Sequence, residues 1–305
     1  LYVAKTEIDK RGGLAVVFGT EQQRTEIENQ TQLCAYLNER FAAGEDNISF
    51  YYTGSDNQTI TNTLVNYMTN ALSSTLDYDT KERRSFSVTL LRYPSEQILN
   101  AWRTKDESAL SADEKKVLRK AESILADAKA ASGSQMELEI ALHDAICKRV
   151  SYLTGKDDVE PAQPQRYMTV VGALLDGKAN CQGYSDAFYL LATMAGFEVG
   201  RQSATSNDDV GHRFNTIHLD GRWYVVDVTY DDAVTKSGSD FPCYMLFNAG
   251  SKMCTDYSWD AAAEPHPIEK KCDSHYYYDY QPTGASALNY QKSFSNLDDL
   301  AVNVL

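Results

Sequence analysis

A two-residue turn between two β-prone runs is the sequence feature that most constrains how this chain can fold. The runs cover residues 212–219 and 222–230, and Asp220-Gly221 lies between them. An Asp-Gly pair flanked by such runs is the strongest short-range signal for a tight β-hairpin. The length of the turn fixes the register, so pairing Leu219 with Arg222 determines every other pair of the hairpin.

In this register His212 and Asp227 share one face of the hairpin. They are diagonal neighbours, with Cα atoms about 7–8 Å apart, which long side chains can bridge. His218 lies on the same face, but the residues opposite and diagonal to it carry no carboxylate. The hairpin geometry therefore selects His212 as a base and Asp227 as the group that orients it.

Upstream of the hairpin, Cys181 opens a predicted amphipathic helix. Asn180 is placed to cap its start, and Gly196 is placed to end it. The apolar stripe of the helix consists of Tyr184, Ala187, Phe188, Leu191, Met194 and Ala195. A thiol in the first turn lies where unpaired N–H groups and the helix dipole favour an anion. Beside a cationic histidine, its pKa can fall from about 8.5 into a range of roughly 3.5–7.5.

Three blocks of the sequence together resemble the transglutaminase-like superfamily. They are Gly-Lys-Ala-Asn-Cys181-Gln-Gly-Tyr-Ser-Asp-Ala-Phe, Gly-His212-Arg-Phe-Asn and Asp220-Gly-Arg-Trp-Tyr-Val-Val-Asp227-Val-Thr-Tyr. The resemblance covers residues 112–280 and is strongest to bacterial members with an N-terminal accessory domain. It departs at Phe214 and Tyr230, where the family usually has Trp. Both replacements keep an aromatic ring, so we expect changed packing rather than lost chemistry.

The resemblance implies an α+β fold with a papain-like core, in which the Cys-bearing helix packs on an antiparallel β-sheet. It also implies a papain-type triad of Cys181, His212 and Asp227 that transfers an acyl group through a thioester. The backbone N–H of Cys181 would hold part of the oxyanion. A second oxyanion donor would come from the segment before the helix, with Gln163, Gln165 and Tyr167 as candidates between which the sequence does not choose.

Three sections are expected along the chain. Residues 1–110 are predicted to form an accessory α/β domain, with strands near 14–18, 48–52 and 86–93 and helices near 26–41 and 58–73. Residues 111–280 would form the transglutaminase-like catalytic domain. Ser111 and Glu114 form a capping-box pattern at the start of its first helix, and a second helix is predicted from 136 to about 153. Residues 281–305 are expected to be a linker or the start of a further segment.

Composition restricts the partners. The net charge is −14 and the isoelectric point is about 4.8, which argues against nucleic acid and anionic membranes. No apolar run approaches the roughly 18 residues of a spanning helix. The six cysteines form no CxxC pair, so neither a metal site nor a cofactor is predicted. His143 and the cysteines other than Cys181 are expected to be structural.

The predicted function is that of a cysteine protease or amidase, or a related acyltransferase. Its expected substrates are peptides, proteins or cell-wall peptides, and hydrolysis is favoured over cross-linking because no feature selects an amine acceptor over water. The alternative is a catalytically idle module that binds a peptide or a cell-wall polymer. From the resemblance to bacterial members, the chain is expected to be exported or attached to the cell surface of a bacterium.

Overall fold

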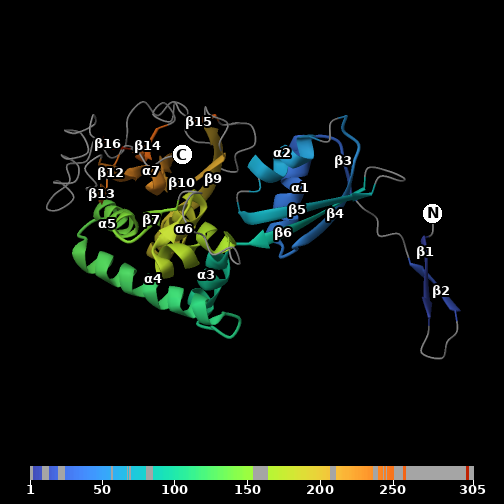
Figure 1. Ribbon diagram of the computed structural model, residues 1–305, viewed down its shortest axis with the longest axis horizontal. Coiled ribbons are helices and arrows are strands. Elements are labelled where there is room, and N and C mark those ends of the chain that lie inside the picture. Colours follow the sequence, from blue (N-terminus) through green and yellow to red (C-terminus); the bar gives the residue numbers. More distant parts are fainter. Residues whose placement is uncertain are drawn as a thin grey trace. The chain divides into compact units, whose positions relative to one another are not determined.

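The computed structural model of the chain describes residues 25–55, 58–66, 68, 70–79, 85–153, 164–206, 211–235, 240–242, 244 and 246–250, together with short strands at 3–8, 14–19, 257–258 and 300–301. The chain divides into two compact units (Figure 1). The first combines Leu1–Thr63 with Thr75–Thr89, and the second combines Leu64–Ser74 with Leu90–Leu305. By this division the residues between Leu90 and residue 110 belong with the second unit, whereas the predicted domain limits at 110 and 280 stay predictions.

The N-terminal part of the chain has the α/β character expected from its sequence. Strands β3 (Thr25–Ile27), β4 (Asn47–Tyr52), β6 (Ser85–Arg92) and β5 (Ala71–Asp79) form one sheet in that order. Helix α1 (Gln30–Ala42) buries Leu33, Leu37 and Phe41, which recur every four residues along one side. Strands β1 (Val3–Ile8) and β2 (Leu14–Gly19) pair separately as an antiparallel ladder. The helix predicted at 58–73 is too long, because α2 (Gln58–Asn66) ends early and β5 follows.

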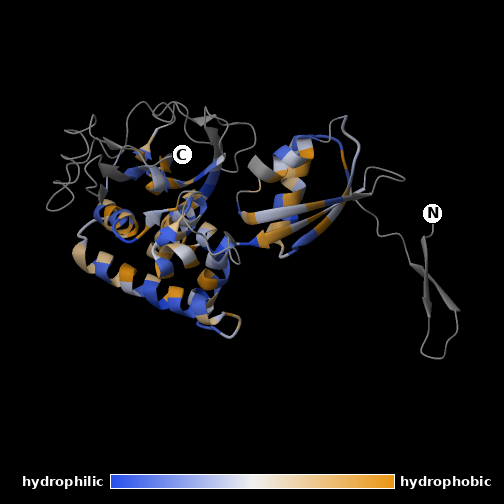
Figure 2. Ribbon diagram, viewed as in Figure 1, coloured by the Kyte–Doolittle hydropathy of each residue, from blue (hydrophilic) through white to orange (hydrophobic). Residues whose placement is uncertain are grey.

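Helices make up the first half of the second unit. They are α3 (Pro94–Thr104), α4 (Ala112–Ala131), α5 (Gln135–Cys147) and α6 (Cys181–Ala195). The predicted capping box is present at the start of α4, where the Ser111 side chain accepts from the Glu114 N–H and the Glu114 side chain accepts from the Ser111 N–H. Hydrophobic residues recur between hydrophilic ones along α4 (Figure 2) and form its buried side. Among the helices that the structure describes, none is long and apolar enough to cross a membrane.

The sheet of the second unit is antiparallel and packs against α6 (Figure 1). Its order is β14 (Phe247–Ala249), β11 (Arg222–Val226), β10 (Gly211–Leu219), β9 (Glu198–Ser206) and β15 (Tyr257–Ser258). The predicted hairpin register is confirmed from Leu219↔Arg222 to Asn215↔Val226. At the turn, Asp220 and Gly221 both have positive φ, of 50° and 78°, as a type I′ turn requires. The α+β fold with a Cys-bearing helix on an antiparallel sheet is confirmed.

Two further predicted boundaries, both in the second unit, are wrong. The second hairpin strand was expected to reach residue 230, but β11 ends at Val226 and the short helix α7 (Val228–Asp231) follows. The helix predicted to end near 153 is α5, which ends at Cys147. Strand β7 (Ser151–Tyr152) then pairs in parallel with β8 (Lys178–Ala179), directly before α6.

Elsewhere in this unit, β12 (Asp232–Thr235) pairs with β13 (Asp240–Pro242) and with β16 (Leu300–Ala301). Apart from β16, the predicted segment 281–305 lies outside the described residues, as does the tyrosine-rich run at 276–280.

Gly183, in the first turn of α6, allows the helix to lie directly against neighbouring backbone. A Cβ at this position would come within 2.6 Å of the Tyr167 carbonyl oxygen and 2.7 Å of the Ala179 Cβ. A backbone carbonyl cannot move aside as the end of a flexible side chain can. The close approach therefore requires glycine at this position.

Overpacking by Gly183→Ala is expected to cost about 1–3 kcal/mol, and alanine gains about 1 kcal/mol over glycine in a helix interior. The free energy of unfolding should therefore fall by up to about 2 kcal/mol. Urea unfolding followed by circular dichroism would measure it. Gly211→Ala is the matched control, since nothing lies within 4 Å of a Cβ at Gly211. Equal stability of the two variants would contradict the prediction.

Candidate active site

Cys181 is the first residue of α6, as predicted. The Asn180 side chain caps the helix by accepting hydrogen bonds from the backbone N–H groups of Gln182 and Gly183, at 3.1 and 3.3 Å. The thiol is almost fully buried, with 9% of the residue exposed. The cap therefore uses the N–H groups of Gln182 and Gly183 and not that of Cys181. The N–H of Cys181 lies at the positive end of the helix dipole, where it can donate to an anion.

His212 and Asp227 meet even though the strand that carries Asp227 ends before it. His212 lies on β10, and its Nε2 is 2.7 Å from Oδ2 of Asp227. Asp227 caps α7, since its Oδ1 accepts from the Tyr230 N–H at 3.1 Å. Both side chains are buried, and the Phe214 ring stacks on the imidazole with centroids 6.1 Å apart. Asp227 thus holds one side of the imidazole ring.

The other side of the imidazole faces the thiol. The Cys181 side chain is hydrogen-bonded to His212 and also to the backbone N–H of Arg213. Because Nε2 is taken by Asp227, Nδ1 is the ring nitrogen left for the sulfur. The structure therefore brings the three predicted residues into one continuous buried chain of contacts, from α7 through β10 to the start of α6.

Electrostatics favour a charged pair at this contact. Burial raises the pKa of the Cys181 thiol, but the hydrogen bond and charge of His212 outweigh burial and leave the pKa below its usual value. Burial lowers the pKa of His212, but the charge and hydrogen bond of Asp227 outweigh it and raise the pKa to about 10. At a pH above the lowered pKa of the thiol and below the raised pKa of the imidazole, the pair is a thiolate beside an imidazolium.

The three oxyanion candidates have different positions. Gln163 lies outside the described residues, and Gln165 is exposed on the 3₁₀ helix η1 (Pro164–Met168). Tyr167, on the same helix, is half-buried, and its backbone carbonyl accepts from the Asn180 N–H at 3.0 Å. The backbone of Tyr167 thus supports the start of α6.

Tyr152 is a site residue that the sequence analysis missed. It pairs with Ala179 in the β7·β8 ladder, and its ring lies 6.3 Å from that of Tyr184, one turn along α6 from Cys181. Burial, together with the charges of Cys181 and Asp227, raises the pKa of Tyr152 to about 12. The phenol therefore stays protonated while its environment is negative. The helical prediction for residues 136–153 hid this strand.

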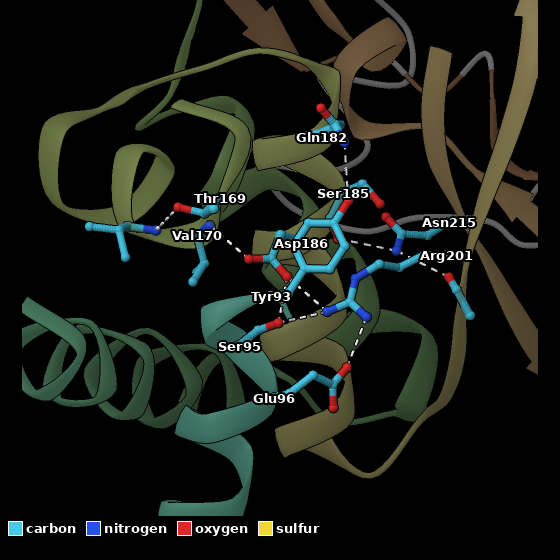
Figure 3. Close-up of polar contacts among 12 residues, drawn as sticks. Tyr93, Ser95, Glu96, Thr169, Val170, Gln182, Ser185, Asp186, Arg201 and Asn215 are labelled. Atoms are coloured by element: carbon cyan, nitrogen blue, oxygen red, sulfur yellow. Dashed lines mark hydrogen bonds and ion pairs between the residues drawn. The ribbon is translucent and has the colours of Figure 1, made fainter. Parts of the chain in front are cut away.

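A second buried network links α6 to β9 and to the Val170 backbone (Figure 3). Asp186 accepts from Arg201 Nη2 at 2.8 Å through Oδ1 and from the Val170 N–H at 2.8 Å through Oδ2. The Arg201 guanidinium lies between the rings of Tyr93 and Tyr189, with centroid distances of 4.3 and 3.6 Å.

Further contacts tie this network to α3 and to the first turn of α6. Arg201 donates to Ser95 at 2.6 Å and to Glu96 at 2.9 Å. Gln182, next to Cys181, donates to the Tyr93 hydroxyl at 3.4 Å. None of these residues was identified as part of the site from the sequence, since their pairings carry no local signal.

Residues 121–228 match the family model described as the Transglutaminase-like superfamily. The matched range begins within α4 and includes Cys181, His212 and Asp227. A search of curated protein sequences found no significant match.

Among solved structures, the chain is similar to one described as a TGase, with 12% identity over 68% of this chain and 59% of that one and a TM-score of 0.34. It is also similar to a putative cysteine protease from Cytophaga hutchinsonii, with 14% identity over 56% and 65% of the two chains and a TM-score of 0.27. A calcium-bound LapG from Legionella pneumophila matches with 11% identity over 54% and 80%, and a TM-score of 0.31. The chain thus spans less than two thirds of the first two structures.

Proposed function

We propose that this chain, which carries a transglutaminase-like domain at residues 121–228, is a thiol enzyme that cleaves amide bonds through a thioester on Cys181. The observation that carries the proposal is the buried run of contacts from Asp227 to His212 to the thiol. A buried thiol with a lowered pKa, at a helix start and beside a histidine held by a carboxylate, has the features of an activated nucleophile.

In the first half of the proposed reaction, the Cys181 thiolate attacks the amide carbonyl carbon, and the carbonyl oxygen becomes an oxyanion. The C–N bond then breaks, and the His212 imidazolium gives its proton to the departing amine. In the second half, His212 takes a proton from water as the water attacks the thioester. The carboxylic acid leaves, and Cys181 takes back a thiolate charge. Asp227 keeps the imidazole oriented throughout.

The proposed oxyanion donors are the backbone N–H of Cys181 and the hydroxyl of Tyr152. The support for Tyr152 is its place beside the residues that lead into α6 and its protonated state next to two negative groups. A phenol of this kind can donate a hydrogen bond to a developing negative charge and cannot compete with Cys181 as a base.

We propose hydrolysis rather than amine transfer, because no feature of the described residues would select an amine over water. The proposed substrates are amide bonds of peptides, proteins or cell-wall peptides. The proposed location, exported or at the surface of a bacterium, would be checked by fractionating cells that express the full-length protein. Recovery only from the cytoplasm would count against it.

The thiol of Cys181 is expected to react with iodoacetamide faster than that of Cys34 at pH 7. Cys34 is the control because it is more exposed to the reagent than Cys181, whereas burial raises the pKa of its thiol. The rate at Cys181 should rise with pH through the lowered thiol pKa, reaching its upper level at a lower pH than at Cys34. Alkylation followed by peptide mapping gives both rates.

His212→Ala should slow the alkylation of Cys181 to a rate no higher than that of Cys34, since the imidazole lowers the pKa of the Cys181 thiol. Labelling of Cys181 no faster than Cys34, with no effect of His212→Ala, would refute the enzyme and favour an idle binding module.

A glutamine peptide, offered with and without a primary amine, distinguishes hydrolysis of the thioester by water from its transfer to the amine. We expect release of ammonia in both cases and no incorporation of amine above the level of Cys181→Ala. Mass spectrometry of the peptide reads both products. Amine incorporation by the unaltered protein would show transamidation instead of hydrolysis.

Tyr152→Phe is expected to lower turnover of an accepted substrate by about 10²–10³-fold, as loss of one oxyanion donor does elsewhere. Alkylation of Cys181 forms no oxyanion, so its rate should stay close to that of the unaltered protein. Unchanged turnover would exclude Tyr152 as a donor, and a parallel loss of alkylation would indicate disturbed packing.

A further inference from the structure

A second buried histidine–aspartate pair lies behind the first. His143, on α5, is fully buried, and its Nε2 is 3.3 Å from Oδ2 of Asp231. Asp231 ends the same short helix, α7, that Asp227 caps, and its N–H donates to the Asp227 carbonyl at 3.0 Å. The two pairs, His212–Asp227 and His143–Asp231, are thus joined by a single helical turn.

The carboxylate of Asp231 also fixes the backbone of Asp227 by a second route. Its Oδ1 accepts from the Leu246 N–H at 2.9 Å. The Leu246 carbonyl in turn accepts from the Asp227 N–H at 3.1 Å. Leu246 therefore holds both ends of the turn, while the other oxygen of Asp231 contacts His143.

Charge makes this arrangement conditional on His143. Asp227 and Asp231 have no exposed surface, and two carboxylates in one buried turn repel each other. Burial is the largest influence and leaves the pKa of Asp231 above its usual value; the contacts with His143 and the Leu246 N–H lower it, and the charge of Asp227 raises it. A buried carboxylate without a positive partner is strongly destabilising.

The rings of Tyr244 and Phe247 pack on His143, and titratable groups lie on its other sides. From α5 these are Asp144, Cys147 and Glu139, whose pKa burial raises to about 8. After β11 they are Asp231 and, beside Cys147, Asp232, while Tyr244 and Lys148 donate to Asp144. Burial lowers the pKa of His143, but its contacts, among them the ion pairs with Asp144 and Asp231, outweigh burial and leave the pKa well above the usual value. The ring is therefore an imidazolium at neutral pH.

Cys147 does not make this cluster a second thiol site. Its Sγ is 4.0 Å from Nδ1 of His143, but the residue is 1% exposed and burial raises its pKa to about 12. A thiol that remains protonated and out of reach of solvent cannot serve as a nucleophile. The charge of His143 therefore acts on the carboxylates of Asp144 and Asp231.

We propose that His143 is a positioning residue of the active site. Its positive charge balances that of Asp231 and stabilises the α7 turn, and this turn keeps the Asp227 carboxylate beside His212. The inference rests on the proposed function, since it assigns His143 a part in tuning the Cys181–His212 pair. It predicts that His143 and Asp231 affect the thiol in opposite directions.

The test is the pH profile of Cys181 alkylation by iodoacetamide in four proteins. His143→Gln removes the positive charge beside Asp231, which disfavours the thiolate and should move the midpoint upward by about one pH unit. Asp231→Asn removes one negative charge near the site while His143 keeps its charge and its contact with Asp144, so the midpoint should move downward. The double variant removes both charges and should return the midpoint close to that of the unaltered protein.

His218→Gln is the matched control. His218 is another histidine paired with a carboxylate, 2.8 Å from Glu198, but it is partly exposed on the surface of the sheet. Its loss should leave the profile unchanged. Shifts of the two single variants in the same direction, or no shift in either, would overturn the proposal. A protein whose unaltered Cys181 shows no lowered midpoint would instead refute the proposed function.

Folding of the variants is itself informative. If His143→Gln does not fold while the double variant does, the charge balance is confirmed, because the double variant lacks the same histidine. If none of the variants folds, nitrogen NMR of the imidazole rings in the unaltered protein decides the question. A protonated His143 at pH 7 supports the proposal, and a neutral ring overturns it.

Discussion

The contact between the Cys181 thiol and the His212 imidazole, across the packing of α6 on β10, is the interaction on which the rest of the site depends. Burying a thiolate and an imidazolium costs several kcal/mol for each charge, so the pair persists only where every charge has a partner. The helix start and the Arg213 N–H stabilise the sulfur, and Asp227 stabilises the ring. Each buried charged partner needs a hydrogen-bonding or charged partner of its own. This explains why polar groups continue into the core behind the site.

Local sequence signals predicted the parts of the site that neighbouring residues determine. The Asp-Gly turn fixed the hairpin register as far as Val226, and Asn180 fixed the first turn of α6. The prediction failed where a capping preference competes with strand formation. Asp227 reads as a strand residue, but its side chain caps α7, so the ladder stops before it. The carboxylate still reaches His212 because its second oxygen remains available for the ring.

Contacts between distant segments could not be predicted from the pattern. Tyr152 lies on a strand too short to show a period of two, directly after a helix whose apolar pattern continues past its true end. His143 and Asp231 are 88 positions apart, and each looks like an ordinary helix or turn residue in its own segment. Arg201 on a strand would be expected to face solvent, but the aromatic faces of Tyr93 and Tyr189 and the carboxylate of Asp186 make its burial favourable.

The enclosure of Arg201 has a consequence for how the protein acquires its reactive thiol. Ser95 and Arg201 are 106 positions apart, and Ser95 and Asp186 are 91 apart, so these pairs close long loops and form late in folding. Until α3 docks, Asp186 and Arg201 lack part of their surroundings and the helix that carries Cys181 is not anchored on that side. We therefore expect the nascent chain to expose an ordinary, slow-reacting cysteine, with nucleophilicity emerging only once synthesis and docking are complete.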